Sequence, residues 1–147
     1  MLSMRTSGAM VAVLLTASFA IGDDGPIAQR RLIMSKMQRA EVTANNVILG
    51  KFFPEKAVAA MKTMEDNLTV FPTLFPGSGG QGETKASPEI WKNMDDFKSL
   101  AAKLVGDAKK AEAAAASGQN AFMLAFAEVK KDCDACHAKY MAGDRRL

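Results

Sequence analysis

Near the C-terminus, two cysteines and a histidine stand together in the pentapeptide Cys133-Asp134-Ala135-Cys136-His137. A Cys-x-x-Cys-His run is the pattern of covalent haem attachment. Each thiol can add across one vinyl group of the macrocycle, and the adjacent imidazole can bind the iron as its proximal ligand. Because residues three apart on a helix share a face, the three side chains can reach one flat group. The run therefore predicts one covalently bound haem c, anchored by Cys133 and Cys136 with His137 on the iron.

Three other uses of paired cysteines fit the sequence less well. A structural zinc site needs about four protein ligands, and the chain has only two cysteines and one histidine, so a carboxylate would have to complete it. A thioredoxin-like Cys-x-x-Cys expects a βαβ context, whereas the neighbouring residues have helical periodicity. A disulfide would join the two cysteines but gives the adjacent histidine no role.

The first 22 residues have the composition of a signal peptide. Arg5 supplies a positive charge, residues 9–21 are apolar, and small residues offer a cleavage site near Ala20 to Gly22. A retained N-terminal anchor is the alternative, but the apolar stretch is short for a transmembrane helix. We therefore expect export to the periplasm, no stable membrane insertion after cleavage, and one haem domain over residues 23–147.

The charge and composition of the chain exclude several function classes. Its 19 Lys and Arg nearly balance 16 Asp and Glu, giving a formal net charge of +3, so no nucleic-acid partner is expected. No pair of carboxylates and no nucleophile with an adjacent base stands out, so we expect no enzymatic activity. A hydrophobic content of 48% is enough for a packed core.

Apolar residues recur at three- and four-residue steps in four stretches, which predicts four helices and no convincing strand. Pro26 and Pro54 suit the first turns of the first two helices, and Ser87 suits the N-cap of the third. The predicted helices cover about residues 26–49, 54–71, 87–116 and 119–141, with a long loop over 71–86. Such helices predict an all-α, antiparallel up-down-up-down four-helix bundle with the haem between helices near one end.

Three stretches of the mature chain, about residues 26–141, also carry a family resemblance. They are the haem motif within the last helix, the segments FPTLFP (71–76) and PEIW (88–91), and the segment RRLIM (30–34). Together they resemble the cytochrome c-prime family, the class II c-type cytochromes. The resemblance implies one haem c in a four-helix bundle.

The resemblance also assigns two residues of the first helix. Arg30 would lie near a haem propionate, with a solvated helix position as the alternative, and Met34 would face the distal side of the iron. In high-spin members of the family the distal residue only covers a five-coordinate iron, which binds nitric oxide or carbon monoxide. In low-spin, c-556-type members a methionine binds the iron. A core position is the other role for Met34, and Met37, one turn away, could compete with it.

The expected function is that of a periplasmic monohaem one-electron carrier of the low-spin branch, with Met34 as the sixth ligand. Histidine and methionine together suit electron transfer, and the chain has no second histidine. The alternative is a high-spin cytochrome c-prime that binds nitric oxide or carbon monoxide.

The chain departs from the family pattern beside the motif. Met141 stands where an Arg or Lys usually follows the aromatic residue, and Lys130, Lys131 and Asp132 stand where a glycine is common. The loss of the proximal basic residue weakens a role in gas binding and leaves haem attachment untouched.

The expected partners are redox proteins of a periplasmic electron-transport chain. Lysines flanking the motif could form a docking patch for an acidic partner, although a solvated face is the plainer interpretation. Family dimers form through the first two helices. Here the outer faces of those helices are polar, so the sequence is compatible with both a monomer and a homodimer. The polar residues are Gln38, Arg39, Lys51, Lys56 and Lys62.

Overall fold

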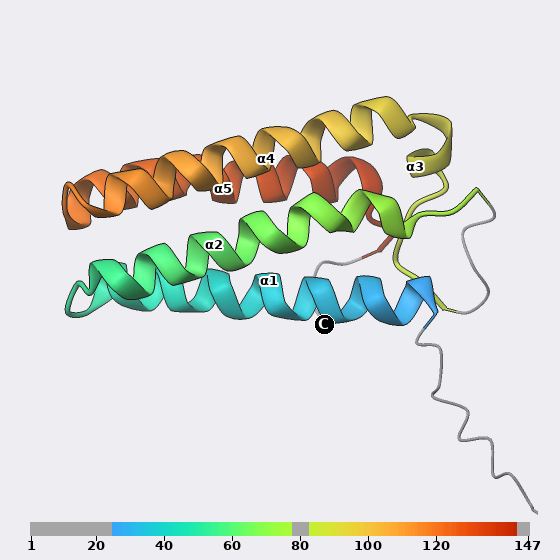
Figure 1. The fold of residues 1–147 in the computed structure, drawn as a ribbon. Coiled ribbons are helices and arrows are strands. Elements are labelled where there is room, and N and C mark those ends of the chain that lie inside the picture. The colour runs from blue at the N-terminus through green and yellow to red at the C-terminus, as the bar shows by residue number, and fades with distance from the viewer. Residues whose placement is uncertain (1–24, 78–82, 144–147) are drawn as a thin grey trace, which may run out of the picture.

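A computed structural model describes residues 25–77 and 83–143, and the predicted signal peptide lies outside them. Four long helices form a bundle in which each runs antiparallel to its neighbours (Figure 1). Within the described residues there is no strand, only an isolated bridge between Ala86 and Met141. The prediction of an all-α four-helix bundle is confirmed. The helices are α1 (Pro26–Leu49), α2 (Pro54–Val70), the 3-10 turn η1 (Phe71–Leu74), α3 (Glu89–Lys92), α4 (Met94–Ala115) and α5 (Gln119–Tyr140).

Prolines set the ends of the first two long helices. Pro26 and Pro54 occupy the first turns of α1 and α2, where the missing N–H is not needed. Pro72 has no N–H to donate to the carbonyl of Leu68, so the α-helical ladder stops at Val70. The chain then continues as the tighter turn η1 rather than entering a loop at once, which shortens the predicted loop.

The third predicted helix is interrupted, so the expectation of one continuous helix from Ser87 is wrong. Asn93 has φ −130° and ψ 43°, and it separates α3 from α4. The carbonyl of Glu89 accepts hydrogen bonds from the backbone N–H of Asn93 at 3.0 Å and from its amide Nδ2 at 3.2 Å, so the side chain adds a local bond at the break. The Ser87 hydroxyl accepts a hydrogen bond from the N–H of Glu89 at 3.2 Å, although Pro88 is the residue that flanks α3.

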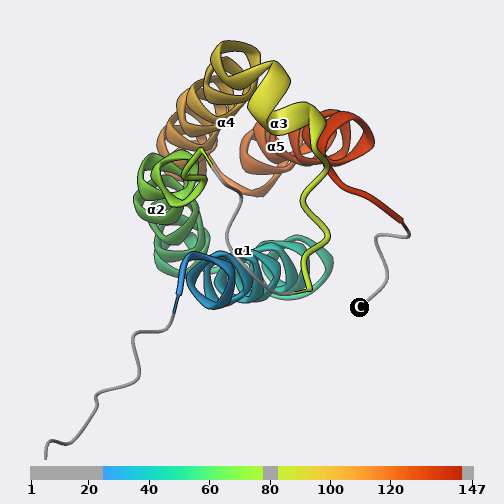
Figure 2. The ribbon, with the colours of Figure 1, turned by 90° about the vertical axis from the view of Figure 1, so that its right-hand side faces the viewer.

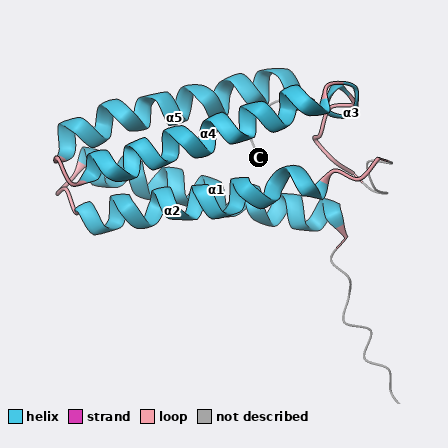
Figure 3. Cartoon of the chain, turned by 45° about the horizontal axis from the view of Figure 1, so that its top comes forward, coloured by secondary structure: helices cyan, strands magenta, loops and turns pink. Residues whose placement is uncertain are grey.

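The four long helices surround one main core. Around the bundle α2 packs between α1 and α4, and α4 packs along α5, whereas α1 and α5 touch one another at few positions (Figure 2). Short connections join α1 to α2 and α4 to α5 at one end, and the long α2–α4 connection lies at the other (Figure 3). The largest fully buried side chains of this core are Met61, Met64, Phe122, Phe126 and Val129.

A second, smaller cluster lies at the end of the bundle that holds the α2–α4 connection. Its buried members are Phe75, Ile90, Phe97 and Tyr140. The ring of Phe97 stands edge-on to Phe75 at 4.9 Å and to Tyr140 at 5.2 Å between centroids, an arrangement that aromatic quadrupoles favour. Within residues 25–77 and 83–143, every helix is too short or too polar to span a membrane.

Candidate haem site

The motif residues of α5 lie where the two clusters meet. Cys133, Cys136 and His137 are half-buried, whereas Asp134 and Ala135 between them are exposed. Cys133 packs against the main core and Cys136 against the second cluster. Neither cysteine forms a disulfide. The helical spacing therefore gathers the two thiols and the imidazole on one inward side of α5, as the sequence predicted they would lie.

Of the two candidate methionines on α1, Met34 is the one that keeps partial exposure. Met34 is half-buried and packs against the main core, which Cys133 also contacts from α5. Met37 is 7% exposed and is a member of that core. Since α1 and α5 contact each other little, Met34 and the motif lie on the two helices that border the least tightly packed side of the bundle.

Arg30 is buried in the first turns of α1. Only 5% of the residue is exposed, which rules out the solvated position considered as its alternative. Its guanidinium carbon lies 4.5 Å from the centroid of the Phe75 ring, a cation–π contact with the second cluster. Burial lowers the pKa of this guanidinium, which still leaves it charged at neutral pH.

The protonation of the motif suits haem c. Burial raises the pKa of the Cys136 thiol to about 11, and the carboxylate of Asp96 adds to the effect, so the thiol is protonated at neutral pH. Burial lowers the pKa of His137, and the carboxylate of Glu41 opposes that change only partly. The imidazole is therefore mainly neutral, the form that binds metals.

An unsatisfied polar atom marks the same place. Nδ1 of His137 is buried and has no hydrogen-bond partner in the described part of the chain, whereas buried polar atoms of folded proteins usually have one. Two half-buried thiols, a neutral imidazole and apolar surroundings fit a haem. Cys133 and Cys136 would hold the macrocycle, and His137 would bind its iron.

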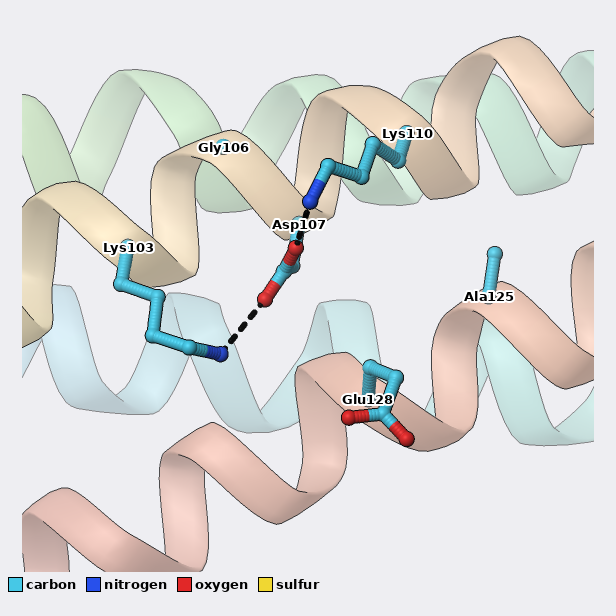
Figure 4. A pocket seen from close by; sticks show the side chains of 6 residues that line it. All are labelled: Lys103, Gly106, Asp107, Lys110, Ala125 and Glu128. Carbon is cyan, nitrogen blue, oxygen red and sulfur yellow. Dashed lines mark hydrogen bonds and ion pairs between the residues drawn. The ribbon is translucent and has the colours of Figure 1, made fainter.

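An ion-pair network that sequence analysis missed holds α5 against α4. The ammonium of Lys103 lies 2.6 Å from Oδ1 of Asp132 and 2.8 Å from Oδ2 of Asp107. Lys110 donates to the other oxygen of Asp107 at 2.7 Å. Figure 4 shows both lysines pointing toward Asp107 in a groove of ≈ 460 Å³ between α4 and α5. No residue proposed above for the haem lines this groove.

A signal for this network was present in the sequence. Asp132 is three residues after Val129 and four before Cys136, so it lies on the inward face of the last helix. A charged side chain on a buried face needs a partner of opposite charge. The partner could not be named, because Lys103 comes from another helix.

The lysines that flank the motif are only partly available for docking. Lys139 pairs with Asp96 at 2.8 Å, and Lys131 lies 3.5 Å from Glu128. The hydroxyl of Tyr140 also donates to Asp96. These two partners hold the pKa of Asp96 below its usual value, so its carboxylate stays charged beside Lys139. Of the three lysines that flank the motif, Lys130, Lys131 and Lys139, the last two thus already meet carboxylates of their own chain.

The described residues offer no alternative metal centre. No three His, Cys, Asp or Glu side chains within residues 25–77 and 83–143 come together in a way that could hold a metal ion. A structural zinc site needs about four such ligands. Cys133, Cys136 and His137 would therefore lack a fourth protein ligand for such a site among the described residues.

A four-helix bundle with a Cys-x-x-Cys-His motif on its last long helix defines a class of c-type cytochrome. A family model described as Cytochrome C' matches residues 25–141. The chain belongs to the cytochrome c′ family, as its sequence resemblance suggested.

Individual relatives come from both branches of that family. A cytochrome c-556 of Agrobacterium tumefaciens (strain II Chrys) is 42% identical over 86 residues, covering 58% of this chain and 70% of the relative. Another cytochrome c-556, from strain B2A of the same species, is 31% identical over 118 residues, or 79% and 96% of the two chains. The crystal structure of cytochrome c′ from Thermochromatium tepidum is 29% identical, with a TM-score of 0.74, over 80% of this chain and 95% of that one.

Membership of the family establishes the coarse biochemistry. The protein is a c-type cytochrome that carries covalently bound haem c, and it is an electron carrier. Relatives in this family include dimers. The relatives include both cytochromes c-556 and cytochromes c′, so family membership is compatible with either a five-coordinate or a six-coordinate iron.

Proposed function

We propose that the protein is a periplasmic one-electron carrier with a low-spin haem c. In this proposal Cys133 and Cys136 form the thioethers, His137 is the proximal ligand and Met34 is the sixth ligand. Residues 1–22 would be removed as a signal peptide, leaving residues 23–147 as the haem domain.

The position of Met34 is the observation that carries this proposal. It is half-buried on α1, it packs against the same core as Cys133, and α1 and α5 contact each other little. Met37 is buried in the core. The chain has one histidine, so a thioether is the strongest remaining side-chain donor for a second axial position.

The haem would supply the redox-active iron, and the chain's own residues would set its surroundings. Histidine with methionine raises the reduction potential, which suits electron transfer. Phe75, Phe97 and Tyr140 form an apolar cluster beside Cys136 that would exclude water. Arg30, fixed on the ring of Phe75, would place a positive charge where a propionate could pair with it.

The test is the absorption spectrum of the reduced protein, with and without carbon monoxide, for the wild type and two matched variants. Met34→Leu and Met37→Leu both remove a thioether while nearly keeping the side-chain volume. We expect a spectrum that carbon monoxide leaves unchanged in the wild type and in Met37→Leu, and a shifted spectrum in Met34→Leu.

Two results would contradict the proposal in different ways. If carbon monoxide shifts the wild-type spectrum as much as that of Met34→Leu, the iron is open, Met34 is only a packing residue, and a gas-binding cytochrome c′ becomes the function. If Met37→Leu is the variant that opens the iron, the ligand is Met37 instead.

A further inference from the structure

A second groove, of ≈ 300 Å³, lies between α1 and α2. Three cationic side chains line it: Lys36 and Arg39 from α1, and Lys56 from α2. Between them the lining consists of small residues, among them the buried Ala40 and Ala60. Small side chains let another chain approach the helix backbones closely, so the groove combines room with positive charge.

The charge of this groove is not neutralised from within. No carboxylate lines it, and Lys36, Arg39 and Lys56 form no ion pair with any described residue. Arg39 donates to the Ser35 hydroxyl at 2.6 Å, and the Lys56 ammonium lies 4.8 Å from the centroid of the Phe53 ring. Neither contact removes a positive charge.

Four other lysines of the bundle differ in this respect. Lys62, Lys103, Lys110 and Lys139 each meet a carboxylate of the chain within 3.2 Å. The helix α2 also carries the exposed acids Glu55 and Asp66, but neither lines the groove. The three cations of the groove are therefore available to carboxylates from outside.

A second copy of the chain is a poor occupant for this surface. A twofold dimer brings the same patch of both copies together. If the groove lay on the twofold axis, its cations would approach their counterparts in the other copy with no carboxylate lining the groove to separate them, and such like-charge contacts oppose association. An acidic protein surface meets no such penalty, and its charges would also speed the encounter.

We propose that the α1–α2 groove is a docking site for the acidic face of a redox partner protein. The inference names the partner chemistry of the electron carrier proposed above and rests on that function. The groove lies on α1, the helix that carries Met34, so a partner seated there contacts an element of the haem site. Of the candidate docking lysines beside the haem motif, Lys131 and Lys139 already contact carboxylates, which makes that patch the weaker site.

The test is calorimetric titration of the haem-loaded protein with an octaglutamate peptide at low and high salt. Lys36→Glu/Lys56→Glu reverses two groove charges, and the matched control Lys98→Glu/Lys130→Glu reverses two exposed charges on α4 and α5. We expect about tenfold weaker binding for the groove variant, little change for the control, and weaker wild-type binding at high salt. The absorption spectrum of each variant checks that its haem domain is intact.

A second measurement keeps the test decisive if the groove variant fails to fold. Peptide added to the wild type should shift the amide resonances of Thr43 and Thr63, which line the groove. Absence of binding, equal weakening by both double variants, or shifts centred on Lys130 would overturn the proposal.

A wild-type dimer in sedimentation that the groove variant abolishes would assign the groove to a second copy instead. Peptide binding does not depend on iron coordination, so its failure is distinguishable from failure of the spectral test.

Discussion

The ammonium of Lys103 on α4 lies 2.6 Å from Oδ1 of Asp132, the residue that precedes Cys133 on α5. The same ammonium contacts the buried Asp107, which Lys110 also contacts. One lysine thus joins two buried carboxylates from neighbouring helices. The network fixes the position of α5 along α4 at the first residue before the haem motif.

Removing that lysine should destabilise the bundle. In Lys103→Met the buried carboxylate of Asp132 loses its cation, and a buried charge without a partner is costly. We expect a lower urea midpoint for the haem-loaded protein with an unchanged slope. Lys98→Met, at an exposed position of the same helix, should behave like the wild type. Equal midpoints for the two variants would mean that the network does not contribute to stability.

Acid should lower the free energy of unfolding through protonation of Asp107. Lys103 and Lys110 hold the pKa of this carboxyl below its usual value in the folded state. The unfolded chain, with an aspartate pKa of about 3.9, then binds more protons than the folded protein as the pH falls. The contribution of Asp107 to stability is therefore present above about pH 5 and is lost as the pH drops further.

The measurement is the free energy of unfolding in urea at several pH values between about 6 and 3. Asp107→Asn removes the titrating group and should decline less steeply than the wild type. Parallel curves for the two proteins would show that other carboxyl groups account for the acid sensitivity.

The core of α5 should be sensitive to a cavity. Phe126 is 1% exposed and stacks on Phe122 with 5.6 Å between ring centroids. We expect Phe126→Ala to lower the free energy of unfolding by about 3–5 kcal/mol. Leu124→Ala, two residues away and 69% exposed in the wild type, should change it by less than about 0.5 kcal/mol. A similar loss from both would contradict the inward orientation of Phe126.

Arg30 should raise the reduction potential. A positive charge close to the iron disfavours the oxidised state, so Arg30→Gln should lower the midpoint potential. We expect a change on the order of tens of millivolts, where about 59 mV is a tenfold shift in a one-electron equilibrium. Arg31→Gln, the exposed neighbour, is the control for a redox titration of both variants. Equal potentials for the two variants would place Arg30 away from the haem.

The sequence predicted most of the fold, because its signals are local. The predicted first helix coincides with α1, and the predicted ends of the second and last helices lie within one residue of those observed. Gly118, which lies between the last two predicted helices, has φ 102°, a conformation that glycine adopts without strain. Proline and glycine act on their own neighbours, so their effects can be inferred without knowing the rest of the fold.

The prediction of one continuous third helix is wrong because two local signals conflict in that stretch. The apolar stripe through Ile90, Met94 and Phe97 favoured a continuous helix, but the backbone of Asn93 leaves the helical conformation and separates α3 from α4. Whether the helix continues or breaks at Asn93 depends on how α3 packs against the α2–α4 connection. There Trp91 Nε1 donates a hydrogen bond to the carbonyl of Pro76 at 2.7 Å. Periodicity does not contain that information.

The sequence by itself determined the class of protein and its cofactor. Cys133, Cys136 and His137 are close along one helix, and their spacing is the one that covalent haem attachment requires. Only the tertiary structure decided the partners of groups from different helices. It placed Arg30 on the ring of Phe75, paired Lys103 with Asp132, and left the cations of the α1–α2 groove without carboxylates. Burial and pairing depend on residues tens of positions apart, and only the packing of whole helices brings such residues together.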